Sequence, residues 1–222
     1  MKKISLFYLL FFTTLVTYAQ EKDSIDFGSE IKKVVIDPMS QYYYPLLLEK
    51  VKNNPMDINE MDCYYLYYGQ IYQPDYKALS FFANPERMAF DRASMNGNCK
   101  KSIPLGKIML EKNPVELTVL LHTSICIDKR KKYVDTDYLP QRYNNLLSAI
   151  FSTGDGKTKE TAIKIVNIED EYILKGTLGF FGGEETLMSD ANHYYSVWSK
   201  NGMNLYLEHI MNVKLPTINK EE

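Results

Sequence analysis

Three consecutive acidic residues, Glu169, Asp170 and Glu171, are the side chains best suited to general acid–base chemistry. Two carboxylates facing one bond could hydrolyse a carbohydrate or a peptide, one as acid and the other as base or nucleophile. Acids at the start of a helix also interact favourably with its dipole, and this structural role is the commoner one. We therefore expect no catalytic residue here and keep hydrolysis as the alternative.

Two histidines and an acid near the C-terminus invite a metal-binding interpretation. The dipeptide Asn201-Gly202, between His193 and the pair Glu208-His209, is the strongest short signal for a β-hairpin with a two-residue turn. Because strand side chains alternate, the two imidazoles then point to opposite faces of the hairpin. We expect no metal site, with His209 bonded to a neighbour at the edge of the core and His193 at the surface.

Tyrosine is frequent, with 18 copies in 222 residues. Tyr64 and Tyr67 lie in one helical segment, and Tyr195 and Tyr206 share the outer face of the hairpin with Glu208. Aromatic rings beside a carboxylate could bind a sugar or a peptide, although such residues are usually ordinary cross-strand pairs. These five residues form the candidate binding surface.

The segment Gly156-Lys157-Thr158 resembles the end of a phosphate-binding loop. That motif needs a glycine where Phe151 stands, a strand before the loop and a helix after it. The hydrophobic periodicity predicts the reverse order, so we interpret the segment as a turn at Asp155 and Gly156. We expect no nucleotide and no other cofactor.

Three cysteines, Cys63, Cys99 and Cys126, leave at least one thiol unpaired within the chain. Cys99 and Cys126 are nearly equidistant from Asn113 and Pro114, which look like the turn of a helical hairpin. A disulfide between them is therefore geometrically reasonable, and buried free thiols are the alternative. The spacing of cysteines and histidines is not that of a zinc site.

The hydrophobic period changes near residue 151. Before this point apolar residues recur with a period of about 3.6, which predicts helices, and after it the run AIKIVNI alternates like a strand. Asp57 with Glu60 resembles a capping box, and Gly69 would let a second helix approach closely. The predicted helices span residues 29–36 (capped by Ser29), 45–54, 57–72, 85–95, 103–111, 115–128 and 140–151. In the third of them, the expected apolar face is Ile58, Met61, Tyr65, Tyr68 and Tyr72.

The helical part carries a weak internal repetition. Asn-Pro recurs at 54/55, 84/85 and 113/114, and the segment LLLEKVKNNPMDI is similar to GKIMLEKNPVEL. We expect helical hairpins stacked side by side, of a degenerate tetratricopeptide-like kind.

Beyond residue 153 we expect a strand from Ile163 and a short helix closed by Gly179. The segment FGGEETLMSD is treated as variable, and the final hairpin should place its Trp198 side on the core. The fold class is α+β, with N-terminal helical hairpins followed by a small α+β domain that ends in a β-hairpin. The predicted organisation is a signal peptide at 1–20, a helical-hairpin domain at 21–153, a small α+β domain at 154–216 and a tail at 217–222.

Composition sets the broad class. An apolar content of 45% can fill a globular core, and a formal charge of −2 offers no field that attracts nucleic acid. The start MKK, the apolar run ISLFYLLFFTTLV and the small residues near Ala19 are typical of a secretory signal. A retained anchor helix is the alternative. We expect a periplasmic or secreted protein without a membrane anchor after cleavage.

Several segments, in order, resemble one protein family. They are LLLEKV, YYLYYGQIYQPDY, KIMLEKNPVEL, SAIFSTGDGKTKETAIKIVNIEDEYILKGTLGF and NLYLEHIMNVKLP. The chain resembles a family of secreted proteins from Bacteroidetes, the domain of unknown function numbered 4919. The resemblance implies export and a helical portion followed by a small α+β tail, and it brings no catalytic residue or cofactor.

The functional expectation follows from the helical array, the tyrosines and the lack of a nucleophile–base pair. We expect an exported, non-catalytic binding or interaction module for a peptide, a partner protein or a glycan in the cell envelope. The alternative is a hydrolase that acts on envelope carbohydrate or peptide.

Overall fold

The computed structural model describes residues 27–74, 76, 85–130, 138–190 and 193–210. The predicted signal peptide and the predicted tail lie outside the described residues. Within the described part, no helix is both long and apolar enough to cross a membrane.

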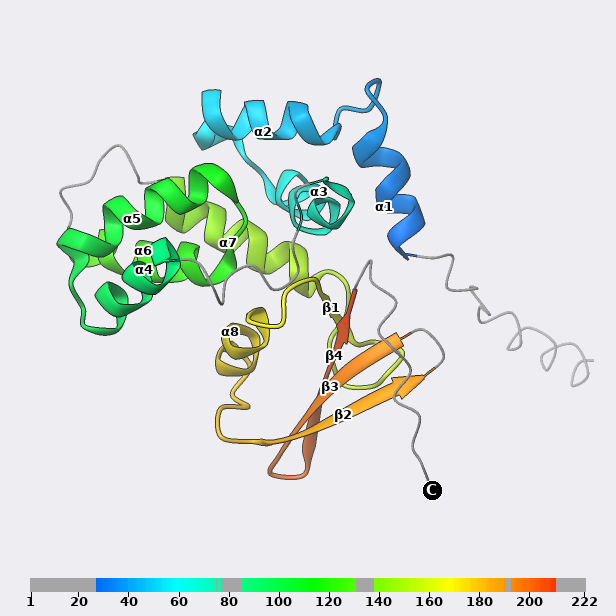
Figure 1. Ribbon diagram of the computed structural model, residues 1–222. Helices are drawn as coiled ribbons and strands as arrows, with labels where there is room; N and C mark the ends of the chain where they lie inside the picture. Colours follow the sequence, from blue (N-terminus) through cyan, green and yellow to red (C-terminus); the bar gives the residue numbers. More distant parts are fainter. Residues whose placement is uncertain (1–26, 75, 77–84, 131–137, 191–192, 211–222) are drawn as a thin grey trace, which may run out of the picture.

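Seven helices come first among the described residues, and they pack mainly on their neighbours (Figure 1). Two short 3-10 turns, η1 and η2, border the third helix. The elements are α1 (Phe27–Ile36), α2 (Tyr44–Asn53), η1 (Pro55–Asp57), α3 (Glu60–Gly69), η2 (Gln70–Tyr72), α4 (Pro85–Met95), α5 (Cys99–Lys112), α6 (Leu117–Arg130) and α7 (Tyr138–Phe151).

The predicted hairpin around Asn113 and Pro114 is confirmed, because α5 and α6 pack together on either side of that turn. The α+β fold class is confirmed as well. The tetratricopeptide-like character and the division at residues 153 and 154 stay predictions.

The start of α3 corrects the predicted cap. Asn59 caps the helix, and its side chain and that of Asp62 each accept a backbone N–H of the other at 2.9 Å. Asp57 instead ends the 3-10 turn that begins at Pro55. The predicted cap at Ser29 is also wrong, since α1 begins at Phe27 and contains that serine.

The predicted apolar face of α3 is only partly right. Met61 is exposed and Tyr65 half-buried, whereas Cys63, Leu66 and Tyr67 are completely buried. The reason is that α3 packs against α1, α2 and α7, so it has no single buried stripe. Gly69 does admit a close neighbour: a Cβ there would lie 2.8 Å from Cγ1 of Val35 on α1.

A four-stranded sheet and one helix complete the described fold (Figure 1). The strand order is β1-β4-β3-β2, with β1 parallel to β4 and the other pairs antiparallel. The elements are β1 (Ile163–Ile165), α8 (Asp170–Thr177), β2 (Glu184–Asp190), β3 (His193–Lys200) and β4 (Met203–His209).

The hairpin prediction is confirmed in its turn, its register and its buried face. Asn201 and Gly202 both have positive φ, and Trp198 pairs with Leu205. Trp198, Leu205 and Leu207 join the same core cluster as the buried residues of the helices. Strand β2 was missed, because all seven of its side chains are exposed and no alternation marks it.

Tyrosine hydroxyls from the α3 region hold the outer edge of β1. Tyr68 donates a hydrogen bond to the carbonyl of Lys164 at 2.8 Å, and Tyr76 donates to the carbonyl of Val166 at 2.9 Å. Tyr67 accepts the N–H of Val166 at 3.2 Å. These backbone groups would otherwise lack partners, because β4 pairs only with the other edge of β1.

Removing these hydroxyls should destabilise the fold unequally. Tyr67→Phe should lower the free energy of unfolding by about 2 kcal/mol, because it strips partners from two buried groups, Val166 N–H and the Asp170 carboxyl. Tyr68→Phe removes one bond and should cost about 1 kcal/mol. Urea unfolding measures both. Tyr172→Phe, at an exposed tyrosine of α8, is the control. A Tyr67→Phe protein as stable as this control would contradict the edge role.

Candidate functional site

The two candidate tyrosines of α3 have different environments. Tyr67 is completely buried, so it cannot belong to an exposed binding surface, and its hydroxyl donates to Asp170 Oδ2 at 2.6 Å. Tyr64 is half-buried in a cluster of rings that includes Phe27, Tyr65 and Tyr68. The helix was expected to expose both rings, and burial on several sides of α3 explains the difference.

The hairpin brings Tyr195, Tyr206 and Glu208 onto one face, as its register requires. That face is not open, however. Tyr195 is buried in a small second core with Ala162 and Val197, and Tyr206 packs against it. The loop between α7 and β1 supplies this cover, an effect of tertiary packing that strand alternation does not reveal.

Glu208 is buried and paired on both oxygens. Oε2 accepts a hydrogen bond from Lys164 Nζ at 2.8 Å, and Oε1 lies 2.6 Å from Nδ1 of His193. Burial alone would raise the pKa of Glu208, but these two partners lower it below its usual value. The carboxylate therefore stabilises the sheet and is not free to receive a ligand.

The two histidines lie on opposite faces of the hairpin, as expected. His193 contacts Glu208, whereas His209 Nε2 lies 3.0 Å from Glu171 Oε1 and 2.9 Å from Ser196 Oγ. Among the residues that the structure describes, no group of three metal-ligating side chains is close enough to hold an ion.

Ser196, His209 and Glu171 have the residue types of a hydrolytic triad, and no sequence signal indicated that they lie together. Their geometry differs from that of a triad. The serine and the acid approach the same ring nitrogen, Nε2, whereas a triad uses both imidazole nitrogens. Ser196 is also buried and donates its own proton to Glu171 Oε1 at 2.8 Å. The cluster instead ties α8 to the hairpin, with Trp198 Nε1 donating to Glu171 Oε2 at 2.9 Å.

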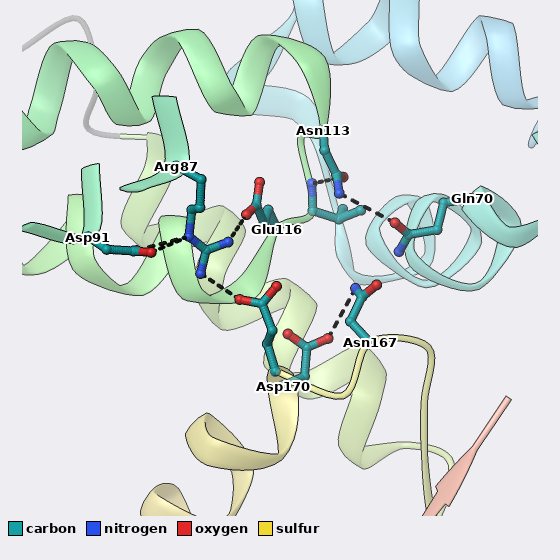
Figure 2. Close-up of polar contacts among 9 residues, drawn as sticks. Gln70, Arg87, Asp91, Asn113, Glu116, Asn167 and Asp170 are labelled. Atoms are coloured by element: carbon teal, nitrogen blue, oxygen red, sulfur yellow. Dashed lines mark hydrogen bonds and ion pairs between the residues drawn. The ribbon is translucent and has the colours of Figure 1, made fainter. Parts of the chain in front are cut away.

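Arg87 gathers three carboxylates from three parts of the chain (Figure 2). Its Nε lies 2.9 Å from Asp91 on α4, Nη1 contacts Glu116 before α6, and Nη2 lies 2.6 Å from Glu169 before α8. Glu169 occupies the cap position of α8, but its side chain makes no cap hydrogen bond. Of these pairs, only Arg87 and Asp91, four residues apart on one helix, carry a local sequence signal.

Burial raises the pKa of three carboxyl groups near this arginine, Glu116, Glu169 and Asp170. Glu116 rises to about 7, mainly through burial, with Arg87 opposing the shift. Asp170 also rises to about 7 through burial, against the hydrogen bonds from Tyr67 and Asn167. An acid that keeps its proton near neutral pH could act as a general acid. Asp170, however, is too deeply buried to reach a substrate, and Glu116 is already paired with Arg87.

The cysteines play structural roles. Cys99 and Cys126 form a disulfide with an S–S distance of 2.07 Å, which joins the start of α5 to α6. Cys63 is free and buried, and burial raises its pKa to about 12. A thiol with so high a pKa is a poor nucleophile at neutral pH.

A groove of about 680 Å³, which was not predicted from the sequence, lies between α2, α5 and α7. Its walls come from residues between Leu48 and Pro55, from residues between Lys107 and Pro114, and from the start of α7. The first two walls belong to the two similar segments that end in Asn-Pro, and that similarity was the signal available in the sequence. The volume is in the range of ligand sites, roughly 300–1,000 Å³.

Asp170 and Glu171 should have opposite effects on the pH dependence of folding. Burial raises the pKa of Asp170 from 3.8 to about 7. The stabilisation that this carboxyl group gives the folded state is therefore fully present below pH 3.8 and is lost as the pH rises to about 7. Hydrogen bonds from His209, Ser196 and Trp198 outweigh burial and lower the pKa of Glu171 from 4.5, so its contribution is lost as the pH falls below 4.5.

Urea unfolding from about pH 3 to pH 8 tests this pair. Asp170→Asn should become more stable relative to wild type as the pH rises, by up to ~1.4 kcal/mol per pH unit. Glu171→Gln should become less stable relative to wild type as the pH rises toward 4.5, and its deficit should then stay constant. Parallel shifts of the two variants would contradict these environments.

Comparison with known proteins identifies the family. Residues 29–210 match the family model described as Domain of unknown function (DUF4919). Searches of the curated proteins and of the solved structures found no significant match. Since the match covers more than half of the sequence, the chain belongs to the DUF4919 family.

Proposed function

We propose that this protein is an exported, non-catalytic module that binds a peptide, a partner protein or a glycan in the cell envelope. The groove between α2, α5 and α7 carries the proposal. It combines apolar walls, at Leu48, Val51 and Leu110, with charged side chains such as Lys52 and Lys107. Mixed linings of this kind suit a polypeptide, which offers both apolar side chains and polar backbone groups.

The hydrogen bonds and ion pairs of Glu169, Asp170 and Glu171 support a non-catalytic role. Glu169 pairs with Arg87, Asp170 accepts from Tyr67, and Glu171 accepts from Ser196 and Trp198. A glycoside hydrolase that uses a carboxylate pair needs two carboxyl groups that reach the scissile bond. The hydrolytic alternative named these three acids, and each of them instead links α8 to another element.

Export is supported by two independent features. The first twenty residues have the charged start, apolar run and small residues of a secretory signal. The disulfide between Cys99 and Cys126 suits an oxidising compartment such as the periplasm, since the cytosol keeps most thiols reduced.

A change in the groove should weaken peptide binding, and a matched change beside it should not. Leu48 lines the groove and is 39% exposed, whereas Leu46, on the same helix, is 46% exposed and is not a lining residue. Against a random-sequence octapeptide library, Leu48→Glu should weaken the selected binders at least about tenfold, or 1.4 kcal/mol. Leu46→Glu should leave them within about twofold. Fluorescence polarisation measures both, and equal losses would contradict a site in this groove.

Export can be tested with the full chain in a bacterial host that has a periplasm. The exported protein should begin near Gln20 and, when denatured, take up one maleimide before reduction and three after it. A chain without residues 1–19 should stay in the cytoplasm and take up three in both conditions. Mass spectrometry reads the N-terminus and the labels together. An uncleaved full-length chain in the cytoplasm would contradict the proposal.

A further inference from the structure

Arg142 on α7 is the most unusual charged residue along the groove. It lines the groove, yet only 3% of its surface is exposed. Within the part of the chain that the structure describes, its Nε has no hydrogen-bond partner and its guanidinium forms no ion pair. Burial lowers the pKa of Arg142, and the neighbours that oppose this shift are Tyr138 and Cys63. Neither of them is charged at neutral pH.

A buried cation without a counter-charge is unfavourable, and proteins normally pair it. Arg87 illustrates the normal case in this same protein, since it is equally buried and contacts three carboxylates. An arginine stays charged at any physiological pH, so Arg142 cannot avoid the energetic cost of a buried charge by losing its proton. Among the described residues nothing supplies this counter-charge, so a carboxylate that enters the groove would be stabilised beside Arg142.

We propose that the groove binds an acidic peptide segment of a partner protein, with an Asp or Glu side chain of that segment paired to Arg142. The inference rests on the proposed binding function and names its ligand. A guanidinium presents parallel N–H groups that match a carboxylate. The Arg142 guanidinium lies 5.0 Å from the centre of the Tyr138 ring, which also lines the groove. This cation–π contact orients the N–H groups of the guanidinium.

The charges along the groove favour the same ligand. Four lining residues are cationic and two are anionic, in a chain whose formal charge is −2. Lys112 pairs with Glu86, which leaves Lys52 and Lys107 without an ion pair among the described residues. These two lysines would attract further acidic residues on either side of the one bound by Arg142. The apolar walls at Leu48 and Leu110 favour a peptide over a free carboxylate ion, because they can bury its aliphatic side chains.

Two octapeptide libraries test the proposal. Both are acetylated and amidated, and they differ only at two central positions, which are Asp or Glu in one library and Asn or Gln in the other. Wild-type protein should bind the acidic library at least about tenfold more tightly. Arg142→Met should lose this preference, and its melting temperature should equal or exceed that of wild type, because an unpaired buried charge is removed. Arg92→Met, at an exposed arginine of α4, is the matched control and should keep the preference.

The outcomes separate the inference from the proposed function. If neither library binds wild type, the binding function itself fails. If both libraries bind equally, or if Arg142→Met keeps the acidic preference, binding stands and the assigned ligand is wrong. An Arg142→Met protein that unfolds at a lower temperature or fails to fold would show that the arginine serves the core, which overturns the inference. Arg142→Lys, which keeps the charge but not the parallel N–H groups of the guanidinium, should retain part of the preference for the acidic library. Dimerisation that Arg142→Met abolishes would identify a second copy as the occupant and also overturn the inference.

Discussion

The fold depends on hydrogen bonds between tyrosine side chains and the backbone along β1, on the side where a further strand would otherwise pair. Strand β1 pairs with β4 on one side. On the other side Lys164 bonds to the hydroxyl of Tyr68, and Val166, directly after the strand, bonds to those of Tyr67 and Tyr76. A short strand with one partner is marginal by itself, so these bonds help to fix its position. They also fix the segment that follows β1, and with it the start of α8.

The start of α8 then distributes this constraint through the molecule. Glu169 pairs with Arg87 on α4, and Asp170 accepts a hydrogen bond from Tyr67 on α3. Glu171 contacts the hairpin through Ser196 and Trp198. Three adjacent acids thus bind three different elements, and each has its own pKa because each has its own partners and burial. From the sequence, these three acids could be catalytic residues or helix caps. In the structure they form hydrogen bonds and ion pairs that connect α8 to the other helices and to the sheet.

Local signals predicted local structure well. Asn201-Gly202 determined the hairpin and its register, because a two-residue turn leaves no freedom in strand pairing. Features that depend on assembly escaped prediction. Strand β2 carries no alternating pattern, and the cover over Tyr195 comes from a distant loop. The groove needs three segments to meet, and only the structure shows that Nε of Arg142 has no hydrogen-bond partner among the described residues.

The two edges of the sheet are unequal, and this limits how molecules could associate. The tyrosines occupy the β1 edge, whereas all seven residues of the edge strand β2 are exposed. Within the described part of the chain, β2 is thus the open edge of the sheet, and an edge that has paired with one further strand is no longer available for growth. Edge-to-edge pairing of two such sheets through β2 would therefore leave no open edge for a third copy among the described residues.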